Sequence, residues 1–174
     1  MNQNRTGLLL VSLVFLVSAC GFKPLYAERQ DKQSVSRDFA AVKILPISNR
    51  TGQILRNELI DRMNPDGQPS EAKYSLEVRS TVSKQTLGIR IDETATRANM
   101  QFSASFRLRE ISSGAVVYKS ATAATTSYNI VSSDYGTISA ERNARKRGAL
   151  LVADSITVRL AAYFNRLRKL RARK

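Results

Sequence analysis

The sequence predicts a two-layer α+β sandwich, in which two helices pack on one face of a four-stranded, mainly antiparallel sheet. Residues 98–110 carry the clearest signal, because apolar and polar side chains alternate strictly along them. The apolar set, which includes two phenylalanines expected in the core, consists of Ala98, Met100, Phe102, Ala104, Phe106 and Leu108. Such alternation indicates a sheet with one covered face and one polar face. Segments of helical period before and after this region supply the second layer.

The folded part is expected to begin with a short strand in residues 40–47, which ends near the proline of that segment. Ser48 or Asn49 is expected to cap a helix over residues 51–63, where apolar side chains recur every four positions. An Asn-Pro-Asp-Gly turn over residues 64–67 ends this helix. The pattern therefore predicts that the chain returns from the first strand to the sheet through a helix.

Three further strands are predicted at residues 73–82, 98–110 and 115–128, and hairpins join them. From about Tyr135 the period of the apolar residues becomes helical. The apolar stripe of this last helix consists of Ala149, Val152, Ala153, Ile156, Leu160, Tyr163, Phe164 and Leu167. The order strand, helix, three strands, helix is the basis of the sandwich prediction.

The start of the last helix leaves three interpretations open. Arg142 and Arg145 would fall on its apolar stripe if the helix continued upstream without change. The helix therefore bends, starts later or overhangs the sheet in this region. Gly148 is the candidate weak point, because glycine destabilises the interior of a helix.

The composition restricts the chemistry that the chain can perform. Its 174 residues include one cysteine and no histidine, which excludes internal disulfides, Ser–His or Cys–His nucleophile pairs and histidine-based zinc sites. Carboxylate chemistry stays open, but the adjacent acids Asp92 and Glu93 fall in a predicted loop without sign of a pocket. We therefore expect no catalytic activity, metal or cofactor, and a carboxylate-based hydrolase acting on envelope glycan is the alternative.

The net charge of +14 calls for an anionic partner or surface. The last 34 residues hold eleven Lys or Arg against two acids, so they carry +9 of this charge. Nucleic acid, acidic lipid and phosphorylated glycolipid all fit a cationic protein. The compartment has to decide among them.

The first twenty residues indicate export. A short polar start with Arg5 precedes an apolar run over residues 8–17, which is typical of a secretory signal and too short for an ordinary membrane-spanning helix. The run ends in Val-Ser-Ala before Cys20, which resembles a bacterial lipobox, and acylation there would explain an odd cysteine in an exported protein. Gly21 in place of aspartate favours the outer membrane under the enterobacterial sorting rule. A plain signal peptide with an incidental cysteine is the alternative.

These signals divide the chain into four expected segments. Residues 1–19 are a lipoprotein signal peptide, and residues 20–40 are a lipidated N-terminus and tether. Residues 41–167 form the α+β domain, and residues 168–174 form a basic tail. Export makes nucleic acid an unexpected partner despite the charge.

The segment Cys-Gly-Phe-Lys-Pro-Leu-Tyr over residues 20–26 resembles the opening of the mature LptE lipoprotein of alphaproteobacteria. The early strand, the Leu-rich helix and the last amphipathic helix agree with that family in pattern. The resemblance implies a two-layer sandwich that sits inside the β-barrel of LptD in the outer membrane. It also implies roles as a plug, as an assembly aid and in lipopolysaccharide transport, with direct lipopolysaccharide binding and no catalysis. An auxiliary lipoprotein of another lipid-transport or secretion complex is the alternative.

Two groups of basic residues are candidates for binding lipopolysaccharide or another anion. The first consists of Arg142, Arg145 and Lys146 in the last helix, and a solvated helix face is its alternative. The second lies in the predicted loop over residues 84–97 and consists of Lys84, Arg90 and Arg97. In better-known LptE proteins a basic residue near this hairpin is tied to lipopolysaccharide binding, but the loop differs here, and an ordinary hairpin is the alternative. The basic C-terminal run is interpreted as a frayed, solubilising tail, and an anion site for lipopolysaccharide or for acidic LptD residues is the alternative.

Overall fold

The computed structural model describes residues 29–89 and 95–173. The chain divides into two units, Met1–Gln33 and Ser34–Lys174, and the first is described only for helical residues 29–33. None of the helices among the described residues is long and apolar enough to cross a membrane. In chain order the described elements are α2 (Arg29–Ala40), β1 (Val42–Ile44), α3 (Asn49–Met63), β2 (Tyr74–Ile89), β3 (Ala95–Glu110), β4 (Val116–Asn129) and α4 (Asp134–Arg171).

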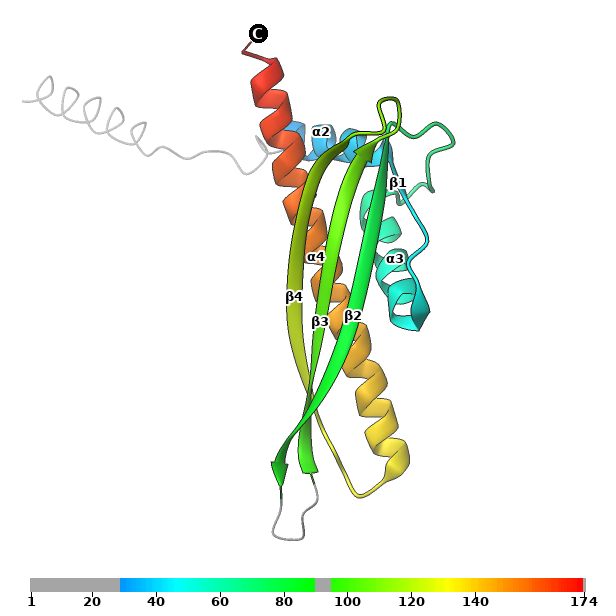
Figure 1. The fold of residues 1–174 in the computed structure, drawn as a ribbon, viewed down its shortest axis with the longest axis vertical. Coiled ribbons are helices and arrows are strands. Elements are labelled where there is room, and N and C mark those ends of the chain that lie inside the picture. Colours follow the sequence, from blue (N-terminus) through cyan, green and yellow to red (C-terminus); the bar gives the residue numbers. More distant parts are fainter. Residues whose placement is uncertain (1–28, 90–94, 174) are drawn as a thin grey trace, which may run out of the picture. The chain divides into compact units, whose positions relative to one another are not determined.

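The four strands form one sheet in the order β1-β2-β3-β4. β1 pairs with β2 in parallel, whereas β2, β3 and β4 are antiparallel neighbours. The helices α3 and α4 lie on the same side of this sheet (Figure 1). The predicted sandwich, with a mainly antiparallel sheet and two helices on one face, is confirmed.

The core lies between the sheet and these two helices. All six residues predicted on the covered face of β3 are buried, and Phe102 and Phe106 are 3% and 2% exposed. From α4, the buried set is Ala144, Gly148, Ala149, Val152, Ala153, Ile156, Leu160 and Phe164. Tyr163 and Leu167 of the predicted stripe are only half-buried, because they lie at its margin near the groove beside β4.

Helix α4 runs without interruption from Asp134 to Arg171. It does not overhang the sheet, because Thr126 of β4 donates a hydrogen bond to the carbonyl of Ala144 at 3.1 Å. The prediction of a weak point at Gly148 is wrong. A Cβ atom there would lie 2.1 Å from a ring carbon of Phe102, so the glycine allows the helix to approach β3 closely.

Asn49 rather than Ser48 provides the capping interaction of α3. Its side-chain oxygen accepts a hydrogen bond from the amide of Gly52 at 2.9 Å, whereas the Ser48 side chain makes no capping bond. The backbone of Asn49 has a φ of 65°, a conformation that asparagine tolerates better than most residues. At the other end, the predicted turn is confirmed by Gly67, which has a φ of 104° and donates to the carbonyl of Asn64.

The predicted tether ends too late. Helix α2 occupies residues 29–40, and its C-terminal part belongs to the second unit, Ser34–Lys174, which is the folded unit of the chain. Phe39 is buried with its ring centroid 6.2 Å from that of Phe164, and its carbonyl accepts a hydrogen bond from the side chain of Asn64 at 3.0 Å. Asp38 forms an ion pair with Arg168, so the predicted tail boundary at residue 168 is also wrong. A single buried aromatic residue in a polar stretch gives no periodic signal.

The predicted loop over residues 84–97 is mostly strand. β2 continues to Ile89 and β3 begins at Ala95, which places Lys84 and Arg97 within strands. Arg90, Asp92 and Glu93 lie outside the described residues. The alternation fades after Val82 because the next residues of β2, from Ser83 to Leu87, are all exposed. Pairing with β3 therefore extends β2 to Ile89, although the side chains from Ser83 to Leu87 are not part of the core.

Candidate anion-binding site

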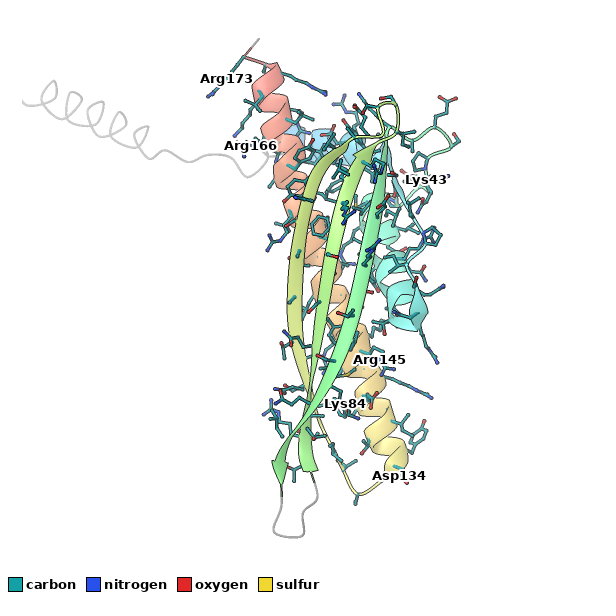
Figure 2. All side chains as sticks on the ribbon, in the orientation of Figure 1. Lys43, Lys84, Asp134, Arg145, Arg166 and Arg173 are labelled. Atoms are coloured by element: carbon teal, nitrogen blue, oxygen red, sulfur yellow. The ribbon has the colours of Figure 1, made fainter. Side chains whose placement is uncertain are left out.

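The carboxylate of Glu141 in α4 organises the cations at one end of the sheet. Lys84 of β2 reaches it with Nζ 2.9 Å from Oε2, and Arg145 reaches the other oxygen with Nη2 2.6 Å from Oε1. The hydroxyl of Tyr128 in β4 donates to Oε2 at 3.0 Å. The Lys84 ammonium also lies 5.5 Å from the centre of the Tyr128 ring, within cation–π range. Three elements thus converge on one acid, and Figure 2 shows Lys84 and Arg145 at neighbouring positions.

In this Glu141 cluster, Lys84 and Glu141 each stabilise the charged form of the other. Hydrogen bonding to Tyr128, and then to Glu141, raises the pKa of Lys84 above its usual value. Hydrogen bonding to Lys84 is the main cause that lowers the pKa of Glu141. Lys84 and Glu141 are therefore both charged at neutral pH. Two cations share one carboxylate, so the cluster keeps one positive charge.

Arg142 and Lys146 supply further positive charge beside this cluster. Both side chains are exposed, and their spacing of four residues makes them neighbours on the helix surface. Within residues 29–89 and 95–173, neither forms an ion pair. Arg147 is engaged differently, because it donates to the backbone carbonyl of Ser127 at 3.0 Å. Arg142 and Lys146 are thus the two cations of the first predicted group that have no carboxylate partner among the described residues.

The structure brings together only part of the predicted binding set. Lys84 and Arg145 lie close together because both form ion pairs with Glu141. The numbers of basic and acidic residues in the sequence do not indicate this shared partner. Arg97 is exposed on β3, where it pairs in register with Asn129 of β4. Arg90 and Cys20 lie outside the described residues. Glu141 and Tyr128 were not among the residues predicted from the sequence, in which the only local signal was the four-residue spacing of Glu141 and Arg145.

The uncovered face of the sheet offers a second polar surface. Its centre is a shallow trough of small side chains that extends from Arg79 of β2 to the edge of β4, where Arg159 of α4 also lines it. The other lining residues on this face are Thr81, Ser103, Ser105, Ala121 and Ala123. Ala104 and Thr122 also line the trough, although Ala104 belongs to the covered face of β3 and the hydroxyl of Thr122 bonds to Ser155 of α4. Such a face can lie flat against a polar wall. In the part of the chain that the structure describes, no group of acids or cysteine could hold a metal ion.

The architecture is that of a group of bacterial lipoproteins. A proposed lipoprotein from Caulobacter crescentus CB15 superposes with a TM-score of 0.61 at 28% identity, covering 75% of this chain and 95% of that one. The minor lipoprotein from Acinetobacter baumannii shares the fold at a TM-score of 0.58 and 18% identity, covering 71% and 92%. The rare lipoprotein B from Shewanella oneidensis does so at 0.55 and 14%, covering 72% and 99%.

The sequence itself identifies the family. The model of the LptE family, described as lipopolysaccharide-assembly, matches residues 39–160. An uncharacterized protein of Rickettsia prowazekii (strain Madrid E) is 30% identical over 160 residues, which cover 91% of this chain and 98% of the relative. The chain therefore belongs to the LptE family of lipopolysaccharide-assembly proteins, as its opening sequence suggested.

Proposed function

We propose that this protein is an outer-membrane lipoprotein, acylated at Cys20, that plugs an LptD-type β-barrel and assists its assembly. In that complex it takes part in lipopolysaccharide transport and insertion into the outer membrane, and it has no enzymatic activity. The observation that carries the proposal is the match of residues 39–160 to the lipopolysaccharide-assembly family. The lipobox-like sequence before Cys20 supports the anchor.

The uncovered sheet face supports the plug role. Barrel lumens are polar, so a domain inside one needs a polar surface that approaches the wall closely. The trough between Arg79 and Arg159 has this character, because hydroxyl and methyl side chains form its floor. The opposite face of the sheet is buried under α3 and α4, which leaves the trough face free for contact.

The cations around Glu141 support a role in binding lipopolysaccharide. The lipid A and core phosphates of lipopolysaccharide are anionic, and arginine can bind phosphate through two hydrogen bonds. Arg142 and Lys146 have no carboxylate partner among the described residues, so they keep their full charge for a ligand. Lys84 and Arg145 would bind a phosphate only in competition with Glu141.

The test is an affinity isolation from detergent-solubilised outer membrane, with the full-length lipidated protein as bait. We expect a stoichiometric large β-barrel protein that survives a high-salt wash, and mass spectrometry should find acyl chains on Cys20. The matched control is Cys20→Ala, which keeps the folded domain but removes the anchor. Recovery of an inner-membrane transporter in place of a barrel would refute the plug role and favour an auxiliary subunit of another lipid-transport complex.

A further inference from the structure

The C-terminal end of α4 carries a concentrated positive charge. Five of the eight residues from Arg166 to Arg173 are Lys or Arg, and none is acidic. Arg168 is neutralised by Asp38, but Arg166, Lys169, Arg171 and Arg173 are exposed and form no ion pair within the described residues. Figure 2 shows Arg166 and Arg173 at the end of the helix opposite Asp134. This cationic end is therefore separate from the Glu141 cluster.

Exposed apolar side chains accompany this charge. Leu170 is 53% exposed between the cations of α4. Ile111 and Val116 are also exposed, and they flank the hairpin between β3 and β4, which lies at the same end of the sheet (Figure 1). Acids are present here too, but Asp38 is paired with Arg168, and Glu110, which accepts a hydrogen bond from Ser113, is outnumbered by the four exposed cations. Cations interleaved with exposed aliphatic side chains are typical of protein surfaces that contact lipid headgroups.

The chain from the expected anchor joins the folded unit at this same end. Ser34 is its first residue, and Asp38 and Phe39 contact Arg168 and Phe164. Cys20 lies nine positions before the start of α2, and a chain of that length spans about 30 Å at full extension, to which the helical residues 29–33 add about 8 Å. The part of α4 from Asp134 to Phe164 rises about 45 Å, so the Asp134 end is farther from this junction than the anchor segment can reach.

We propose that this end, formed by Arg166, Lys169, Leu170 and Arg171 together with the β3–β4 hairpin, docks on anionic phospholipid headgroups of the membrane that holds the anchor. The inference rests on the acylation of Cys20 in the proposed function. Docking gives the anchored protein a second attachment to the bilayer. It also fixes an orientation in which the Glu141 cluster points away from the anchoring leaflet.

The protein offers a specific probe of this orientation. Cys20 is its only cysteine, and acylation blocks that thiol, so an introduced cysteine is the only reactive one. We would label Leu170→Cys and, as the matched control, Ile138→Cys with an environment-sensitive dye. Both positions are exposed in α4, at 53% and 49%, but they lie at opposite ends of the helix. The lipidated full-length variants go into vesicles of phosphatidylethanolamine and phosphatidylglycerol that contain a nitroxide-labelled quencher lipid.

We expect several-fold stronger quenching at position 170 than at position 138. Replacing phosphatidylglycerol by phosphatidylcholine, or combining Arg166→Glu, Lys169→Glu and Arg171→Glu, should remove the difference. Equal quenching at both positions, or quenching at 170 that ignores lipid charge, would overturn the inference. The barrel isolation is a separate readout, so quenching without a barrel refutes the plug role alone. A Cys20 found without acyl chains overturns both.

Discussion

Gly148 of α4 faces the ring of Phe102 in β3 so closely that a Cβ atom would lie 2.1 Å from ring carbon Cε2. The close approach fixes the distance between the helix and the centre of the sheet. Because Phe102 is itself buried, its ring has little room to move away. A residue that weakens a helix in isolation is therefore required by its packing in the folded protein.

Gly148→Ala should destabilise the protein by about 1–3 kcal/mol through overpacking, despite a gain of up to about 1 kcal/mol in helix propensity. Urea unfolding measures the change. Gly136→Ala is the control, because the nearest atom there is a methyl of the exposed Val131, at 2.9 Å. In a double-mutant cycle, Phe102→Leu should reduce the cost of the alanine, and additive effects would contradict the proposed clash.

Glu141→Gln tests whether the Glu141 cluster binds anions. The substitution removes the carboxylate that Lys84 and Arg145 share, so both cations become available to a phosphate. We expect stronger binding of lipopolysaccharide by the variant than by the native protein, measured by titration at fixed ionic strength. Arg142→Gln together with Lys146→Gln should weaken binding. Unchanged affinity in both variants would show that lipopolysaccharide binds elsewhere.

The same acid predicts a small pH dependence of stability. The pKa of Glu141 is lower in the folded protein than in the unfolded chain, mainly because of Lys84. Its contribution is therefore present above the ordinary glutamate pKa of about 4.3 and is lost as the pH falls through the folded value. Partly exposed pairs of this kind contribute about 0–1 kcal/mol. The difference in unfolding free energy between the native protein and Glu141→Gln should thus be small at pH 7 and vanish in acid.

Phe39→Ala tests the docking of α2 on the folded unit. Phe39 packs against Phe164 and is buried, so its truncation should cost about 3 kcal/mol in unfolding free energy. Asp38→Asn is the control, because it removes only a partly exposed ion pair with Arg168 and should cost less than about 1 kcal/mol. Limited proteolysis of Phe39→Ala should show faster cleavage near residues 34–40. Equal stability of both variants would contradict a structural role for this segment.

Leu151 and Val158 are exposed by 52% and 61% on the outer face of α4, two helical turns apart. Exposed apolar side chains on a helix indicate a contact surface when they share one face. In the proposed complex, Leu151→Glu combined with Val158→Glu should reduce co-isolation of the barrel. Unfolding free energy should change by less than about 0.5 kcal/mol, because neither side chain is buried. Ile138→Glu is the matched control, and a barrel recovered equally with all variants would exclude this surface.

The fold class follows from local patterns in the sequence. The alternation along β3 and the apolar stripe of α4 are local patterns, since each follows from the geometry of a single element. They correctly predicted Phe102, Phe106, Ile156 and Leu160 as core residues. The family was also accessible, because the residues next to Cys20 are specific and the element order agrees with them.

The pairing of the charged residues, in contrast, depends on tertiary contacts. The partners Lys84 and Glu141 are 57 positions apart, and Asp38 and Arg168 are 130 positions apart. Such pairs leave no periodic signal, because they depend on where separate elements meet. For the same reason the sequence alone predicted a weak point of the helix at Gly148, although its missing side chain makes room for Phe102. Periodicity specifies which face of an element is buried, whereas packing between elements decides which cations remain free for a partner.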